Sequence, residues 1–185
     1  MTGEHSSKQY DQELEAIRSK VLLMGGMVET AFDEAMEAFR VGDAARADRV
    51  IADDQAVNQL EVQLDDACSH LIVRRQPTAN DLRTVMASIK VITDLERIGD
   101  EASKIARTAK NLHERNGAPF AHYDMVRTIS RATADLLHNA LDAFARLDGK
   151  QALELIAADE VVDHEFRTIL RTMVTYMMED PPTNN

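Results

Sequence analysis

Apolar residues recur every three or four positions along almost the whole chain, with polar residues between them. This spacing places the apolar side chains on one face of an α-helix. No stretch alternates apolar and polar residues as a half-buried strand would. The pattern therefore predicts five long helices, at approximately residues 12–41, 44–75, 79–115, 123–146 and 150–178.

Capping and helix-breaking residues support these boundaries. Asp43 follows Gly42 and is a typical N-cap for the second helix. Pro77 cannot continue that helix beyond Arg75. The segment "NGAP", residues 116–119, ends the third helix and separates the two halves of the chain. The sequence therefore predicts an all-α protein of five long antiparallel helices.

An internal repeat relates the two halves. A shift of 105 positions places "EAMEAFRVGDAARADRVIADD", which starts at Glu34, on "NALDAFARLDGKQALELIAAD", which starts at Asn139. We interpret this as a duplicated three-helix unit, with a first unit at residues 1–115 and a second, two-helix unit at residues 120–185. The second unit lacks a counterpart of the third helix of the first unit, which leaves a groove. This groove is expected to be covered by another chain or by the first unit, or to stay open.

Composition narrows the class of protein. The 185 residues include only 7 Gly and 4 Pro, which favours helices, and carry a formal net charge of −11, which argues against binding to nucleic acid backbones. Cys68 is the single cysteine, so no disulfide framework exists and a reducing cytoplasm is expected. No apolar run reaches the ~20 residues of a membrane span. A soluble cytoplasmic protein is expected.

The densest charge pattern lies in "ITDLERIGDEASKIA", residues 92–106. Glu96 and Asp100 are one helical turn apart and share a face. Helical geometry also places them on one row with four residues that we expect to face the core: Leu82, Met86, Ile89 and Thr93. The two carboxylates are therefore expected to face the edge of a neighbouring helix.

The second helix offers a complementary polar row, formed by Asp54, Asn58, Glu61 and Asp65. Together the two rows could supply oxygen ligands to a cation such as magnesium, manganese or iron, because clustered carboxylates repel one another without one. The alternative is a solvated face with ion pairs from Glu96 and Asp100 to nearby cations: Arg97, Lys104 and Arg107. Spacing leaves both readings open.

The segment "RRQPTANDLRTVMASIKVITDLERIGDEASKIA", residues 74–106, closely resembles the first-repeat signature of the PhoU family, accessory proteins of bacterial phosphate-specific transport. "MGGMVE" in the first helix and the duplicated architecture extend the resemblance over nearly the whole chain. It implies tandem three-helix bundles that bind metal ions, often iron or zinc, at carboxylate pairs. The positions that match such a pair are Glu96 and Asp100 on the third helix. The resemblance implies that the second helix of each unit contributes a further pair, Asp54 with Asn58 in the first unit and Asp159 with Asp163 in the second.

The resemblance also implies a function. PhoU proteins restrain the phosphate-starvation response and modulate phosphate uptake by contacting the transporter ATPase and a membrane sensor histidine kinase. The resemblance therefore implies a regulatory protein that has no catalytic activity and no organic cofactor. It also implies a location in the cytoplasm, with recruitment to the inner membrane by the partners. We also expect a homodimer, because dimerisation would cover the open groove of the second unit.

The chain departs from the family pattern after "MMEDP". Family members continue there into another helix with a second carboxylate pair, whereas this sequence reads "MMEDPPTNN". Asp159 and Asp163 are therefore expected to lack third-helix partners.

Two rival functions stay open. A carboxylate-bridged metalloenzyme usually requires Glu-x-x-His pairs from two helices, which this sequence lacks. A structural bundle that only forms oligomers is the other.

Overall fold

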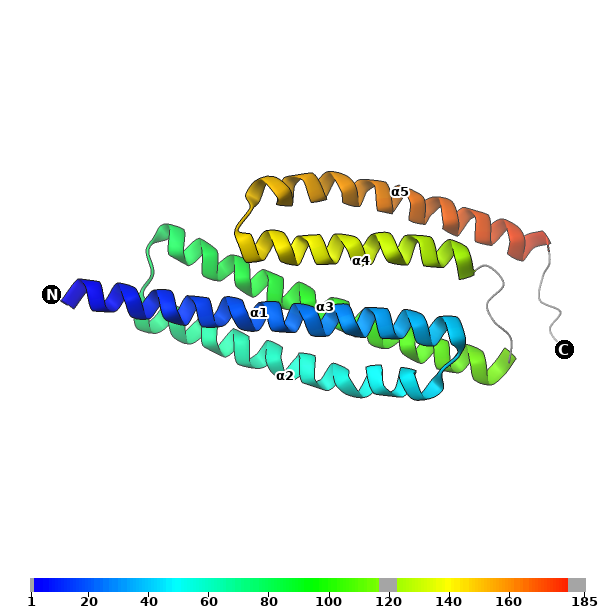
Figure 1. Ribbon diagram of the computed structural model, residues 1–185, viewed down its shortest axis with the longest axis horizontal. Coiled ribbons are helices and arrows are strands. Elements are labelled where there is room, and N and C mark those ends of the chain that lie inside the picture. The colour runs from blue at the N-terminus through cyan, green and yellow to red at the C-terminus, as the bar shows by residue number, and fades with distance from the viewer. Residues whose placement is uncertain (1, 117–122, 180–185) are drawn as a thin grey trace. The chain divides into compact units, whose positions relative to one another are not determined.

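A computed structural model describes residues 2–116 and 123–179, and within these ranges all regular structure is helical (Figure 1). The helices are α1 (Thr2–Val41), α2 (Ala44–Arg75), α3 (Ala79–Asn116), α4 (Tyr123–Arg146) and α5 (Gly149–Glu179). The predicted all-α fold is confirmed. Gly117 to Pro119, predicted to stop α3, and residues 180–185, where the family's further helix would begin, lie outside the described residues.

α1 begins ten residues earlier than its apolar periodicity predicts, at Thr2 instead of Gln12. Its first turns consist almost entirely of polar residues, so they carry no apolar stripe from which a helix could be recognised. The helices fall into two compact units, α1–α3 within Met1–Asn116 and α4–α5 within Gly117–Asn185. None of the described helices combines the length and apolarity needed to cross a bilayer.

Unit 1 is an up-down-up bundle with a constant register. Three neighbouring pairs show that α1, with the residue that follows it, runs parallel to α3. The partners are always 71 positions apart: Tyr10 and Asp81, Val28 and Gly99, and Gly42 and His113. α2 runs antiparallel to both. The Arg75 guanidinium donates to the Glu13 carboxylate at 2.7 Å near one end of α2, and the Lys110 ammonium donates to Asp48 at 2.7 Å near the other.

The core of unit 1 is narrow at one end and wider along its length. Near the α1–α2 turn, small side chains form a buried cluster and allow close helix packing: Ala35, Ala38, Ala47, Val50, Ala102 and Ala106. Farther along, larger side chains such as Met24, Leu64 and Ile92 are fully buried. These large contacts are where removal of apolar surface from water contributes most to stability.

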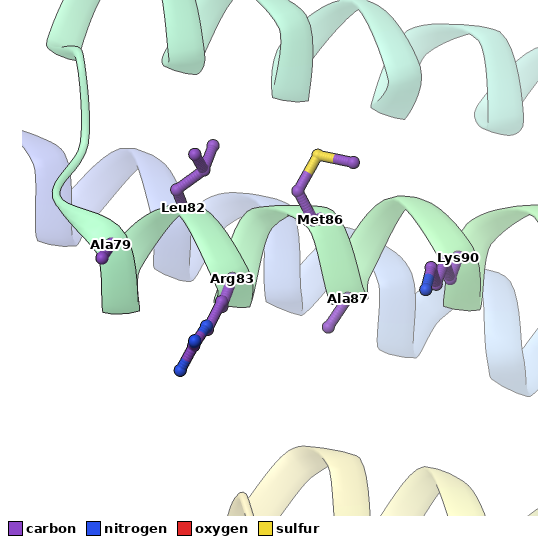
Figure 2. Close-up of a pocket in the computed structure, with 6 residues that line it drawn as sticks. All are labelled: Ala79, Leu82, Arg83, Met86, Ala87 and Lys90. Carbon is purple, nitrogen blue, oxygen red and sulfur yellow. The ribbon is translucent and has the colours of Figure 1, made fainter.

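The buried stripe of α3 differs from the one predicted. It passes through Val85, Ile92 and Leu95, and then continues to Ala102 and Ala106. Leu82 and Met86, which the sequence placed on the core row, are exposed and line an outer pocket with Ala79, Arg83, Ala87 and Lys90. Figure 2 shows the Leu82 and Met86 side chains projecting from one side of α3, away from that of Arg83. The prediction was wrong because the positions of α1 and α2, not the periodicity of α3, decide which face is covered.

The two interhelical turns preserve the repeat. Asp43 caps α2 through its Oδ1, which accepts from the Arg46 N–H at 2.9 Å, and Asp148 caps α5 by accepting from the Gln151 N–H at 3.0 Å. The backbone N–H of each Asp donates to the residue five positions earlier, Ala38 or Ala143. The shift of 105 positions is therefore confirmed at these turns.

Unit 2 has a much smaller core. Of its described residues, only Leu141 and Ala143 are buried. α5 packs against α4 within this unit and leaves several large apolar side chains exposed, among them Ile156, Phe166 and Leu170. Two helices enclose too little volume to bury both of their apolar faces.

The residue before each capping Asp generates a stability prediction. Gly42 and Leu147 both adopt the left-handed conformation, with φ of 71° and 53°. Leu147→Gly should raise the free energy of unfolding of the α4–α5 unit by about 1 kcal/mol, because a side chain is strained in this conformation. Little packing is lost, since Leu147 is 62% exposed. Urea and thermal unfolding followed by circular dichroism measure the change.

Gly42→Ala is the reverse change and should destabilise the α1–α3 unit by more than this, because its Cβ atom would also overlap the His113 imidazole, which would have to move. Equal stability of Leu147→Gly and the parent protein would show that the second turn carries no conformational strain.

Candidate metal centre

Two pairs of polar side chains meet where α2 packs against α3. Asp54 and Asn58 lie one turn apart on α2, Glu96 and Asp100 lie one turn apart on α3, and all four are half-buried. The antiparallel register brings the pairs together, so that the charge of Asp100 acts on both Asp54 and Glu96. The structure thus places four of the six predicted ligand residues in one region, at the edge of the buried stripe.

Burial and mutual repulsion raise the pKa values of two of these carboxyls. Desolvation and then the charge of Asp100 raise the pKa of Asp54, while Arg107 lowers it. Desolvation is also the largest cause of the raised pKa of Glu96, followed by the charges of Asp100, Glu61 and Asp54. Each carboxylate is therefore less stable as an anion here than in water. The region would gain stability from added positive charge.

Two buried oxygens face this region without a partner. Neither Asp54 Oδ1 nor Asn58 Oδ1 has a hydrogen-bond donor among the described residues. Buried acceptors are nearly always paired, because losing their hydrogen bonds to water costs about 1–3 kcal/mol. Oxygen atoms in this state are suited to accept a cation or a water molecule.

Gly99 is a contributor that the sequence analysis did not single out. A Cβ atom at Gly99 would lie 3.3 Å from Val57 Cγ1 and 3.5 Å from Asp54 Oδ1. The absence of a side chain therefore allows α3 to approach α2 beside the carboxylates. The sequence does contain a sign of this contact, namely a glycine inside a predicted helix. Glycine at such a position lowers helix stability by about 1 kcal/mol relative to alanine, and it often marks a place where two helices approach closely.

Two of the basic residues that were candidates for ion pairs with Glu96 and Asp100, Arg97 and Lys104, pair with other acids instead. Arg97 lies 3.8 Å from Asp94 and the Lys104 ammonium lies 2.8 Å from Glu101, all on the exposed side of α3. Within the described ranges, Glu96 and Asp100 have no salt bridge to a basic side chain. Arg97 and Arg107 still lower the pKa values of Glu96 and Asp54 through their charges, but desolvation and the neighbouring carboxylates outweigh them and both pKa values stay raised.

The side chains are close but do not converge on one point. Among residues 2–116 and 123–179, no three His, Cys, Asp or Glu side chains are arranged to hold one metal ion. Binding a cation at Asp54, Asn58, Glu96 and Asp100 would require side-chain rotation, and metal binding stays a prediction. Of the other two carboxylates in the predicted α2 row, Glu61 is half-buried and Asp65 is exposed.

The third predicted pair is in a different environment. Asp159 and Asp163 lie on α5 of unit 2, and both are exposed. The Arg167 guanidinium donates to Asp163 at 3.0 Å. No third-helix carboxylates occur beside them in the described part of unit 2, whose helices are α4 and α5.

Comparison with known families identifies the protein's relatives. The family model described as "PhoU domain" matches residues 21–109 and 126–185. The chain belongs to the PhoU family. One PhoU relative, the "Phosphate-specific transport system accessory protein PhoU" of Escherichia coli (strain K12), is 45% identical over 181 residues, which are 98% of this chain and 74% of the relative. A PhoU homolog of Pseudomonas aeruginosa is also 45% identical, over 96% of this chain and 73% of its own.

Solved PhoU structures share the fold. The crystal structure of PhoU from Pseudomonas aeruginosa superposes with a TM-score of 0.88 at 45% identity, covering 93% of this chain and 82% of that one. The PhoU structure from Streptococcus pneumoniae has a TM-score of 0.84 at 24% identity, over 92% of this chain and 80% of its own. The resemblance recognised in "DLERIGD" and its flanking sequence is confirmed.

The raised pKa of Asp54 leads to a pH-dependent prediction. A carboxyl whose pKa is higher in the folded state lowers stability as pH rises through its titration. In the presence of a chelator, Asp54→Asn should therefore raise the free energy of unfolding at about pH 8 by about 0.5 kcal/mol, through relief of repulsion with Asp100. The gain should disappear at about pH 4, where the carboxyl becomes protonated. Urea unfolding across this range measures both effects.

Asp53→Asn is the matched control, because Asp53 is the adjacent residue on α2 and is exposed. It should show no comparable gain. A loss of stability for Asp54→Asn at the higher pH would contradict the repulsion argument.

Proposed function

We propose that this protein regulates phosphate uptake and the phosphate-starvation response as an accessory component of a phosphate-specific transport system. The observation that carries the proposal is similarity over 98% of the chain to a protein named "Phosphate-specific transport system accessory protein PhoU". Regulation would occur through binding to the transporter ATPase and to a membrane sensor histidine kinase. This role places the protein in the cytoplasm, at the inner membrane surface when its partners are engaged.

The helical bundle supports docking more than chemistry on a substrate. Long helices present extended surfaces, and the net charge of −11 favours basic surfaces on a partner. Cys68 is buried, and burial raises the pKa of its thiol to about 11, so this group is a poor nucleophile. Ser88 and Ser103 are also fully buried. We assign no catalytic residue.

A cation bound between α2 and α3 would control the shape of the surface with which the protein docks on its partners. Asp54, Asn58, Glu96 and Asp100 would hold a cation such as iron, zinc, manganese or magnesium, because their oxygens include buried acceptors without partners. A bound cation would neutralise their mutual repulsion. Asp54 and Asn58 would then be tied to Glu96 and Asp100, which would fix the packing of α2 against α3 and the surface these helices present.

Complementation tests the regulatory role. A bacterial strain that lacks its own PhoU should express a phosphate-starvation reporter even in phosphate-rich medium. Expression of this chain should restore repression, with empty vector as the control. A reporter that stays active despite folded, abundant protein would contradict the proposal.

Capture of the transporter ATPase or the kinase cytoplasmic domain by the purified chain separates regulation from a purely structural bundle. An unrelated acidic helical protein should capture neither.

Elemental analysis tests the metal site separately. The purified protein should retain a divalent metal ion, and Glu96→Gln/Asp100→Asn should lose most of it. Asp94→Asn/Glu101→Gln is the matched control, because it removes the same charge from exposed positions on the same helix. Equal metal content in all three proteins would exclude the site while leaving the regulatory proposal intact.

A further inference from the structure

The first half of α3 has a pocket on its outer side. Its volume is about 460 Å³, and it is lined by residues of α3: Ala79, Leu82, Arg83, Met86, Ala87 and Lys90. Leu82 and Met86 are 37% and 45% exposed, although both side chains are large and apolar. Neighbouring apolar side chains that stay exposed beside a pocket are typical of an interaction surface. A methionine in such a place also adapts its shape easily to a partner.

The charge of this pocket is opposite in sign to the charge of the whole chain. Its charged lining residues, Arg83 and Lys90, are both basic and exposed, whereas the chain has 32 acidic residues and 21 basic ones. In the part of the chain that the structure describes, neither of the two makes a salt bridge. Asp81, which lies between pocket residues in the sequence, instead accepts from the Thr78 hydroxyl at 3.0 Å. Both cations are therefore available to an acidic partner.

The spacing of the lining residues fits a second helix. Leu82 and Met86 are one turn apart, while Arg83 and Lys90 are two turns apart, about 10.5 Å along the axis. Figure 2 shows Leu82 and Met86 on one side of α3, away from Arg83. Ala87 is small and leaves space between the two cations for a large side chain of a partner. A packed helix repeats with the same spacing, so it can match both the apolar and the basic side of the pocket.

We propose that this pocket binds an acidic amphipathic helix of another protein. Two apolar side chains of that helix, one turn apart, pack on Leu82 and Met86, and two of its carboxylates, two turns apart, pair with Arg83 and Lys90. An extended strand fits less well, because a helix has no unpaired backbone edge to which a strand could add. An anionic membrane also fits less well, because the net charge of −11 repels the rest of the chain from it. The inference rests on the pocket and does not depend on the proposed role in phosphate regulation.

A synthetic peptide provides the test. The probe is a fluorescein-labelled helical peptide of about 20 residues, in which two Leu are one turn apart, two Glu on the adjoining face are two turns apart, and the other residues are Ala and Gln. The full chain should bind this Glu peptide in fluorescence anisotropy, and added salt should weaken the binding, because it screens the ion pairs. A Lys peptide, with Lys in place of both Glu residues, should bind at least about tenfold more weakly.

Substitutions in the protein locate the binding site. Arg83→Glu/Lys90→Glu should weaken binding of the Glu peptide about tenfold or more and should bind the Lys peptide instead, because the charges are again complementary. Such an exchange of preference requires a folded protein, so it separates loss of the site from loss of the fold. Leu82→Ser/Met86→Ser should also weaken binding of the Glu peptide, because the apolar contact is lost while both cations remain.

Lys20→Glu/Arg49→Glu is the matched control. It changes the net charge by the same amount at exposed positions of α1 and α2 outside the pocket, and it should bind the Glu peptide like the parent chain. A folded parent chain that does not bind the Glu peptide, or equal binding by the parent and Arg83→Glu/Lys90→Glu, would overturn the proposal. It would also be overturned if Arg83 and Lys90 control binding to phosphatidylglycerol vesicles or self-association of the chain, but not binding of the peptide.

Discussion

The close approach of α3 to α2 at Gly99 is the constraint on which the candidate site depends. With no side chain at this position, Val57 lies where it would crowd a Cβ atom, and Asp54 lies within van der Waals contact of the same point. Burial at this contact, and then the charge of Asp100, raise the pKa of Asp54. A Cβ atom at this position would require the Val57 side chain to shift by a few tenths of an ångström. Close packing and charge repulsion are thus two consequences of one contact.

The rest of unit 1 maintains this contact against the repulsion. Parallel packing of α1 on α3 keeps one register along their length, and the small side chains near the α1–α2 turn keep the three helices close. Ion pairs from Arg75 and Lys110 connect neighbouring helices near the two ends of the bundle. Buried apolar packing supplies most of the stability, because ion pairs at this degree of exposure contribute about 1 kcal/mol or less.

Comparison of the two repeats shows how a third helix changes the surroundings of equivalent residues. Asp159 and Asp163 occupy the positions of Asp54 and Asn58 in the second copy of the repeat. In unit 1 the polar pair is half-buried against α3, and one oxygen of each residue has no hydrogen-bond donor. In unit 2 the pair is exposed, and Asp163 forms an ordinary salt bridge with Arg167. Equivalent residues thus differ because a neighbouring helix covers only one pair.

The sequence by itself determined the five helices apart from the start of α1, the capping Asp43 and the repeat register, because helical periodicity and capping are local properties. It also indicated the family and the polar pairs on α2 and α3, Asp54 with Asn58 and Glu96 with Asp100. The tertiary structure alone decided which face of α3 is buried. Leu82 and Met86 read as core from periodicity yet lie outside, since a broad apolar stripe fits several rotations of the helix. The contact at Gly99, the unpartnered oxygens and the true partners of Arg97 and Lys104 also emerged only there, because they depend on distances between helices.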